Sequence, residues 1–368
     1  MILPRIYRHS SLTYKPALDG LRGIAILMVL SQHKFGDISK GYIGVDIFFV
    51  LSGYLISQIT SKAISDHQLK GILEFYRNRI FRLAPIYFVM LLSVLVLKIS
   101  YQAANESELI SSFVNPSWQS ILASATYTSN LFRNFDILGH TWSLSAEEQF
   151  YLIFPLIFFI STRKKIMEKS FLTLLFLFPL VVGLAFFYIS VKNHSFNQHS
   201  FFSDFIVRPS EIAIGCFIGL RKIKSAFKIK FQLAADLTFI LLLLIVIFYT
   251  SPLTASLITG FTLYLIESNA SSFIKKCILK LLTNSVLVNL GILSYSIYIW
   301  HVLIYFSISH FQSNRWDMNY LVYFSFSLII TIVVIFAYFS YTFFEIPFKN
   351  FLIKKFDNRK ADLNRFKA

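Results

Sequence analysis

The sequence predicts an all-α, polytopic membrane protein with about ten transmembrane helices, and three observations support this class. Hydrophobic residues make up 55% of the 368-residue chain and charged residues only 15%, whereas soluble domains carry about 25% charged residues. Apolar segments long enough to cross a bilayer recur along the chain. Lys and Arg occur in short clusters between these segments, so the net charge of +16 reflects membrane topology and we exclude a nucleic-acid partner.

Ten apolar segments are predicted to span the membrane, because each has roughly the 17–25 residues that a transmembrane helix needs. They cover approximately residues 19–36, 41–62, 84–100, 145–162, 169–190, 205–221, 232–250, 252–268, 287–310 and 319–343. Only the sequence TSP at 250–252 separates the seventh segment from the eighth. The longest loop between spans, residues 101–142, is predicted to form an extracytoplasmic cap.

The distribution of basic residues predicts that both termini are cytoplasmic. With the N-terminus inside, about four-fifths of the Lys and Arg residues fall on the cytoplasmic side, as the positive-inside rule expects. An odd number of spans would break this alternation. We therefore expect an integral-membrane domain over residues 1–348 and a basic cytoplasmic tail over residues 349–368, which contacts anionic membrane lipids.

Polar residues of the first predicted span share one helix face. The segment DGLRGIAILMVLSQHKF covers residues 19–35 and contains Arg22 and His33, eleven residues apart. At 100° and 1.5 Å per residue, these side chains lie on one face, about 16 Å apart. Ionisable groups within spans are costly and are usually functional. The alternative is that Arg22 anchors the cytoplasmic end and that His33 is an interfacial residue. Asp19 either pairs with Arg22 or caps the first turn.

The next two segments add one carboxylate and two arginines. Asp46, in GYIGVDIFFVLSGYLIS, lies in the outer third of the second span, at the predicted depth of His33. A buried carboxylate needs a partner. Arg79 and Arg82, in FYRNRIFRLAPIYF, are neighbours on one helix face. They form either a cytoplasmic phosphate clamp or part of an interfacial helix that binds lipid phosphates.

The fourth predicted span opens with two adjacent carboxylates. Glu147 and Glu148, in HTWSLSAEEQFYLIFP, point about 100° apart on a helix. One would then face the bundle and the other water. The alternative is a solvated helix start with acidic residues at its N-terminus.

Polar pairs also occur in the sixth and ninth predicted spans. Arg208 and Glu211 are three residues apart and can pair at the outer end. Ser294, Tyr298 and His301 recur at helical spacing and predict one polar stripe deep in the membrane.

Sorted by predicted depth, these side chains form two layers. The inner layer contains Arg22, Arg79, Arg82, Glu345 and Lys349, and the outer-to-middle layer contains His33, Asp46, Glu147 or Glu148, Arg208, Glu211 and His301. The first helix connects the layers along one face. This geometry suits an anionic donor held inside and a base that acts further out.

Five segments, in this order, resemble the acyltransferase 3 family of bacterial integral-membrane O-acyltransferases. They are YKPALDGLRGIAILMVLSQH, GYIGVDIFFVLSGYLIS, FYRNRIFRLAPIYF, TWSLSAEEQFYLIFP and SYSIYIWH, and the resemblance covers residues 14 to about 348. It implies a multi-pass protein of the bacterial cytoplasmic (inner) membrane. It also implies transfer of an acyl group, usually acetyl from cytoplasmic acetyl-CoA, to a hydroxyl of a periplasmic, cell-surface or lipid-linked glycan.

The resemblance assigns roles to particular residues. The family's Arg and His of the first span fall on Arg22 and His33, its paired arginines on Arg79 and Arg82, and its acidic element on Glu147 and Glu148. His33 would act as general base, oriented by Asp46 or Glu147, or would carry the acyl group. The arginines Arg22, Arg79 and Arg82 would hold the pyrophosphate of acetyl-CoA, and the acceptor would contact Arg208, Glu211, Tyr298 and His301. No metal is expected. Because the chain ends soon after the last predicted span, any further periplasmic transferase would be a separate protein.

Two other functions compete with acyl transfer. One is export of a glycan or a lipid-linked intermediate on the same fold. The other is secondary transport with His33 and His301 in a proton relay, which the absence of sequence repeats disfavours. The acceptor stays open among lipopolysaccharide O-antigen, capsule, peptidoglycan and periplasmic glucans, and succinyl or another small acyl group could replace acetyl.

Overall fold

The computed structural model describes residues 14–35, 40–104, 115–132, 136–163, 165–192, 207–221, 236–244, 251–268, 272–313, 321–352 and 354. Within these ranges the chain is helical apart from short turns, and no strand occurs there. This confirms the all-α class. Predicted spans or tail residues beyond these ranges lie outside the described residues.

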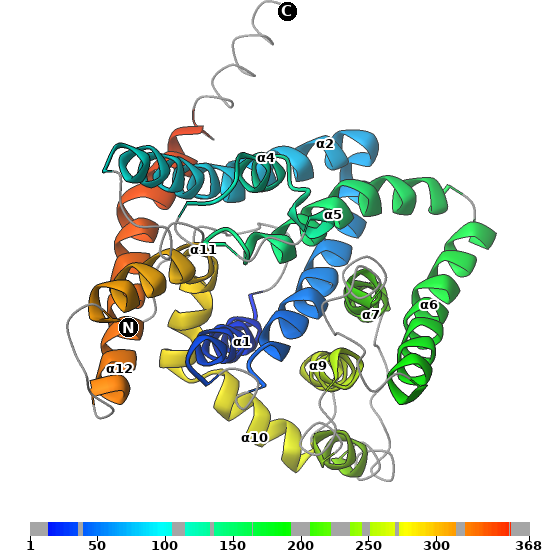
Figure 1. Ribbon diagram of the computed structural model, residues 1–368. Helices are drawn as coiled ribbons and strands as arrows, with labels where there is room; N and C mark the ends of the chain where they lie inside the picture. The colour runs from blue at the N-terminus through cyan, green and yellow to red at the C-terminus, as the bar shows by residue number, and fades with distance from the viewer. Residues whose placement is uncertain are drawn as a thin grey trace, which may run out of the picture.

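The helices form one bundle (Figure 1). In chain order they are α1 (Pro16–Phe35), α2 (Ile43–Ala104), α4 (Trp118–Ala125), the short helix η2 (Ser129–Leu131), α5 (Thr141–Ser161), α6 (Lys165–Lys192), α7 (Arg208–Leu220), α9 (Pro252–Glu267), α10 (Phe273–Leu282), α11 (Ser285–Ser313), α12 (Leu321–Phe339) and the π-helix η4 (Ser340–Glu345). Helix α1 packs against α2 and α11, and α2 packs against α7.

Five segments of the described chain are long and apolar enough to cross a membrane. They are Ile43–Asp66, Leu69–Ser100, Thr141–Ser161, Ser285–Tyr305 and Ser327–Leu352. These segments support the prediction of a multi-pass membrane protein. Helix α7, with 13 residues, extends only about 20 Å, less than the ~30 Å of bilayer hydrocarbon. The count of ten spans and the cytoplasmic location of both termini stay predictions.

Helix α2 contains both the second and the third predicted spans. A side chain on Gly71 would collide with the carbonyl oxygen of Ala63, eight residues earlier. In a straight helix those residues would lie about 12 Å apart, so α2 bends sharply between them, and its second half runs across the top of the bundle in Figure 1. The second apolar segment begins at Leu69, and Pro85 lies inside it. This segment includes the predicted third span, residues 84–100.

Helix α1 is held to its neighbours through glycines. A Cβ atom on Gly20 would strike the carbonyl oxygen of Leu282, and one on Gly291 would strike the carbonyl oxygen of Asp19. Such direct contact between backbones is typical of small residues at the crossings of membrane helices. A similar close contact at a glycine joins α2 to α7, where Gly53 lies against the backbone carbonyl of Ile212.

Gly44 at the start of α2 contacts the backbone of Ala25, eight residues before His33 on α1. Asp46 is two residues further along α2. Its common depth with His33 stays a prediction, because the side chain of His33 lies outside the described residues.

Residues 115–132 close one end of the bundle. The ammonium of Lys98, which is 4% exposed, donates to the Asn115 side chain at 2.5 Å and to the Pro116 carbonyl at 2.8 Å. Hydroxyl groups of Ser129 and Thr141 lie 3.0 Å apart and join η2 to the start of α5. Burial raises the pKa of Asp136 in the turn that precedes α5. These contacts fix the position at which α5 begins.

Candidate functional site

The first half of α5 carries polar side chains into three buried clusters inside the bundle. Trp142 contacts an ion triad, Ser143 contacts a tyrosine–histidine cluster, and Glu147 and Glu148 face α2. A polar helix start would be solvated in a soluble protein. Here it is packed among helices that are long and apolar enough to span a membrane, where polar groups usually mark a functional site.

The ion triad joins α2 and α7. The guanidinium of Arg208 pairs with the carboxylate of Asp46 and, at 3.0 Å, with that of Glu211. All three residues are at most 3% exposed. The Arg208–Glu211 pair confirms the pairing predicted from their spacing, whereas the partner of Asp46 was not predicted.

In this triad two carboxylates pair with one guanidinium. Oδ2 of Asp46 is buried and accepts no hydrogen bond from any residue that the structure describes. The Arg208 guanidinium carbon lies 5.3 Å from the Trp142 ring centre and 5.9 Å from the Phe49 ring centre. These rings add cation–π attraction in a desolvated place, and they enclose the triad.

The second cluster joins α5 to both halves of α2. Ser52 donates to Oε1 of Glu147 at 2.9 Å, and the Tyr151 hydroxyl donates to Oε2 at 3.3 Å. Arg79 pairs with Glu148 at 3.3 Å and lies over the Tyr151 ring, 3.1 Å from its centre. Both carboxylates thus contact side chains of α2, and the Glu148 side chain is 26% exposed.

The same cluster brings the two predicted layers into contact. Arg79 was placed in the inner layer and Glu148 in the outer-to-middle layer, yet they form one ion pair. Arg79 lies ten residues inside the apolar segment that begins at Leu69, about 15 Å along the helix axis. Sorting by predicted depth therefore separated two residues that the fold brings together.

The third cluster is made of hydroxyl and imidazole groups from α5 and α11. The Tyr298 hydroxyl lies 2.5 Å from the Ser143 hydroxyl and donates to the His140 carbonyl at 3.1 Å. The imidazole of His140 packs edge-on against that of His301, with ring centres 5.5 Å apart. Nδ1 of His301 lies 2.7 Å from the Tyr298 carbonyl oxygen. Tyr298 and His301 are thus brought together, and Ser294 on the same helix is also buried.

The three clusters are joined through the first turns of α5, which carry Trp142, Ser143 and Glu147. They therefore belong to one polar region. Among the described residues, no group of three or more His, Cys, Asp or Glu side chains could hold a metal ion.

A separate polar group surrounds the π-helix η4. Ser296 donates to Glu345 at 2.5 Å, and Ser340 donates to it at 3.3 Å. Helix α2, which carries Arg82, packs against η4. Arg82 and Glu345, two members of the predicted inner layer, thus lie on elements that are in contact. Single turns of π-helix are frequent at functional sites.

Helix α1 runs without a break from Pro16 to Phe35, so it contains both Arg22 and His33. The Arg22 guanidinium lies 3.7 Å from Asp19, which also accepts from the Tyr14 hydroxyl at 3.4 Å. The pairing of Asp19 with Arg22 is thus confirmed. The side chain of His33 lies outside the part of the structure that is described.

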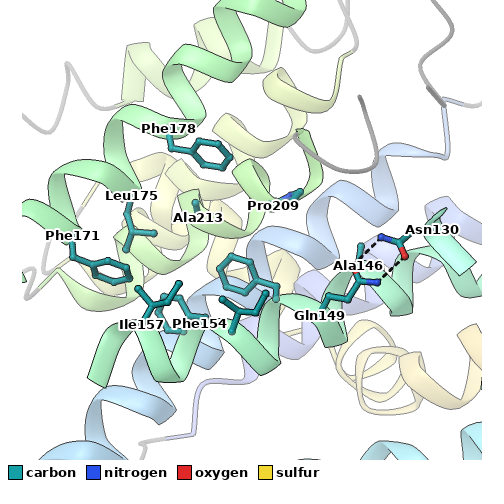
Figure 2. Close-up of a pocket in the computed structure, with 12 residues that line it drawn as sticks. Asn130, Ala146, Gln149, Phe154, Ile157, Phe171, Leu175, Phe178, Pro209 and Ala213 are labelled. Carbon is teal, nitrogen blue, oxygen red and sulfur yellow. Dashed lines mark hydrogen bonds between the residues drawn. The ribbon is translucent and has the colours of Figure 1, made fainter. Parts of the chain in front are cut away.

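A pocket of about 320 Å³ lies between α5, α6 and α7, next to this region. Figure 2 shows Phe154 and Ile157 of α5 opposite Phe171, Leu175 and Phe178 of α6. At one end the amides of Asn130 and Gln149 bond to each other at 3.0 and 2.9 Å. This lining suits a hydrocarbon group and offers no charge to a phosphate.

Five residues of the polar region were not selected from the sequence. They are Ser52, His140, Trp142, Ser143 and Tyr151. His140, Trp142 and Ser143 stand in the segment HTWSLSAEEQFYLIFP, which opens the fourth predicted span. Ser52 and Tyr151 carry no charge, and only the packing of α2 on α5 shows that they are partners of Glu147.

A helical bundle with buried ion pairs and imidazoles in its apolar interior defines a membrane-embedded functional site. The chain belongs to the acyltransferase 3 family, whose sequence model, described as "Acyltransferase domain", matches residues 15–340.

Curated relatives match nearly the whole chain. "Putative O-acetyltransferase SAR0937" of Staphylococcus aureus (strain MRSA252) is 30% identical over 383 residues, which cover 98% of this chain and 61% of the relative. "Putative peptidoglycan O-acetyltransferase YrhL" of Bacillus subtilis (strain 168) is 29% identical, with 96% and 58% covered. "O-acetyltransferase OatA" of S. aureus (strain NCTC 8325 / PS 47) is 27% identical, with 96% and 60% covered. The chain thus spans about three-fifths of the length of these relatives. No solved structure gives a significant match.

Proposed function

We propose that this chain is a membrane O-acyltransferase that moves an acetyl group from acetyl-CoA to a hydroxyl of a cell-surface or lipid-linked glycan, in the bacterial cytoplasmic membrane. The family match supports the reaction class. The names of the relatives support acetyl as the acyl group and, for one of them, peptidoglycan as the acceptor. The polar region on α5 supports a site inside the membrane bundle.

A sugar hydroxyl is a weak nucleophile, so the reaction needs a base or an acyl carrier. His33 serves in this proposal, because imidazole changes its charge near neutral pH and suits both roles. The imidazolium that forms needs negative charge nearby. Asp46 is a suitable source, because its Oδ2 is buried and accepts no hydrogen bond from any residue that the structure describes.

The donor phosphates need cations at the opposite end of α1. Arg22 lies on α1, and Arg82 lies near Lys349. We assign the coenzyme A phosphates to these groups, because guanidinium forks match phosphate oxygens. Arg79 is held by Glu148 and the Tyr151 ring, so we assign it a positioning role for the carboxylates rather than a direct role in phosphate binding.

The acceptor glycan is assigned to the third cluster and the triad next to it. Tyr298 and His301 offer hydroxyl and imidazole groups to sugar hydroxyls, and Arg208 and Glu211 lie within the same region. An acceptor hydroxyl held there would lie among groups that can receive its proton. The observation that favours this place is the convergence of α5 and α11 through Ser143 and Tyr298.

The test uses purified protein in proteoliposomes with radiolabelled acetyl-CoA and isolated cell-wall or lipid-linked glycans. The variants His33→Ala and Arg22→Ala should lose O-acetyl transfer by about 10²-fold or more, and Lys70→Gln should retain it, because Lys70 is an exposed residue of α2. Unchanged O-acetyl transfer by His33→Ala would show that His33 is neither the general base nor the acyl carrier. In cells, failed glycan export without any loss of O-acetyl groups would favour the exporter instead.

A further inference from the structure

Helix α10, Phe273–Leu282, is a short basic helix between α9 and α11. Its sequence FIKKCILKLL contains three lysines, and no acidic residue occurs between residues 268 and 316. The hydroxyl of Ser272 caps its start by accepting from the backbone N–H of Lys275 at 3.0 Å. After a two-residue connection, the apolar segment Ser285–Tyr305 begins. Helix α10 therefore lies at the end of a predicted transmembrane helix.

One face of α10 packs on α1. Ile278 and Leu279 contact the apolar cluster that includes Leu21, and Leu282 is 2% exposed. The carbonyl of Leu282 lies against Gly20, two residues before Arg22. The ammonium of Lys275 turns inward and donates to the Ser268 carbonyl, and burial lowers its pKa. This face needs no further partner.

The opposite face of α10 is exposed and has two stripes. Phe273, Cys277 and Leu281 recur every four residues and form an apolar stripe, in which Phe273 is 76% exposed and Leu281 is 57% exposed. Lys276 and Lys280 are also exposed and lie beside it, one turn apart. At 100° per residue, the basic stripe and the apolar stripe are adjacent on one surface.

This arrangement is typical of helices that lie flat in the membrane interface, with an apolar stripe in the acyl boundary and lysines at the headgroups. We propose that the exposed face of α10 binds anionic phospholipid headgroups through Lys276 and Lys280, while Phe273 and Leu281 enter the acyl boundary. Two observations favour a bilayer as the occupant. The stripe continues into Val286, 64% exposed, at the start of α11, and the surface has positive charge with no acidic neighbour in the chain segment.

The two cysteines make this proposal directly testable. Cys277 is exposed on the apolar stripe, whereas Cys216 is buried and 0% exposed. A fluorescent maleimide on Cys277 of the full chain in nanodiscs therefore reports from α10. We expect quenching by spin-labelled phospholipid and protection from aqueous iodide. Access to iodide together with no quenching by lipid would overturn the interfacial placement.

The lipid charge is tested by energy transfer from this fluorophore to headgroup-labelled phosphatidylglycerol or phosphatidylcholine. Phosphatidylglycerol should be enriched around α10. Because each lysine near an anionic surface contributes about 1 kcal/mol, a factor of about five, the enrichment should fall several-fold in Lys276→Gln/Lys280→Gln. The pair Lys276→Arg/Lys280→Arg should keep it, and so should Lys70→Gln.

Equal enrichment in the glutamine pair and the original protein would overturn the proposal. A change in fluorescence on adding inorganic phosphate to phosphatidylcholine nanodiscs, at constant ionic strength, would assign the lysines to a soluble anion and would also overturn it. Both substituted lysines are exposed, so we expect the variants to fold, and size-exclusion profiles and thermal unfolding check this. No acyl transfer is measured, so the outcome is independent of the proposed function.

Discussion

The guanidinium carbon of Arg79 lies 3.1 Å from the centre of the Tyr151 ring, while Nε of the same residue pairs with Glu148 at 3.3 Å. Arg79 of α2 therefore contacts two side chains of α5: it forms an ion pair with Glu148, and its planar guanidinium stacks on the Tyr151 ring. Tyr151 in turn donates to Glu147. The position of the adjacent carboxylates thus depends on Arg79, although the two helices are far apart in the sequence.

Arg79→Lys should lose most activity although it keeps the charge. Lysine cannot stack on Tyr151 and has no fork for Glu148. The pair is about one-quarter exposed, so we expect a stability loss on the order of 1–2 kcal/mol, below the 3–5 kcal/mol of a fully buried pair. Thermal unfolding and acetyl transfer in proteoliposomes measure both effects. Arg77→Lys, two residues earlier on α2, is the matched control. Full activity of Arg79→Lys would contradict the positioning role.

The triad of Asp46, Arg208 and Glu211 predicts an order of destabilisation. Arg208→Gln leaves two buried carboxylates without their cation and should cost the most, on the order of 3–5 kcal/mol. Asp46→Asn and Glu211→Gln each leave one intact ion pair and should cost less. Denaturant unfolding of the three variants in one detergent measures the order. If Arg208→Gln were the most stable of the three, the triad would not hold α2 to α7 as described.

Two glycines should respond very differently to substitution by alanine. In Gly291→Ala, the new Cβ would strike the Asp19 backbone, which cannot move without displacing α1. In Gly260→Ala it would meet only side-chain ends of Ile214 and Ile218, at 2.9 and 3.0 Å. We expect Gly291→Ala to cost about 3 kcal/mol, the upper end for overpacking. Gly260→Ala should be close to neutral, because alanine favours helix. Similar unfolding temperatures for the two variants would show that α1 and α11 can separate cheaply.

The variant Glu147→Gln distinguishes the effect of the carboxylate charge on catalysis from the effect of the side chain on packing. Glutamine keeps the size of the side chain, but its amide can accept from only one of the two hydroxyl donors, so a loss of about 1 kcal/mol is expected. Loss of the charge should lower the turnover number by at least tenfold if Glu147 supports the base. Ser52→Ala is the comparison, because it removes one donor at 2.9 Å and keeps the carboxylate. Equal turnover numbers for both variants would assign Glu147 a structural role alone.

Contacts within one helix were predictable from spacing. The pairs Asp19–Arg22 and Arg208–Glu211 are three residues apart, and helix geometry alone brings them together. Contacts between helices were not. Asp46 and Arg208 are separated by 162 residues, and spacing gives the face of a side chain but not the helix that it meets.

The layer prediction failed at Arg79 for a related reason. Residues 77–82 contain three arginines and so resemble an interfacial segment. A hydropathy scale gives each arginine the same cost, whether or not a partner in the fold neutralises it. In the fold, Arg79 pairs with Glu148 and lies over the Tyr151 ring, so sorting by depth separated two residues that are in contact. The family assignment survived these errors, since it depends on the order of the segments rather than on their depth.

The glycine contacts of α1 have a mechanical consequence. Backbone touches backbone at Gly20, Gly44 and Gly291, so α1 can neither slide nor roll without breaking its contacts with α2 and α11. Because Arg22 and His33 lie on one unbroken helix, their backbones stay about 16 Å apart. An acyl group that passes from one to the other must therefore cover that distance itself.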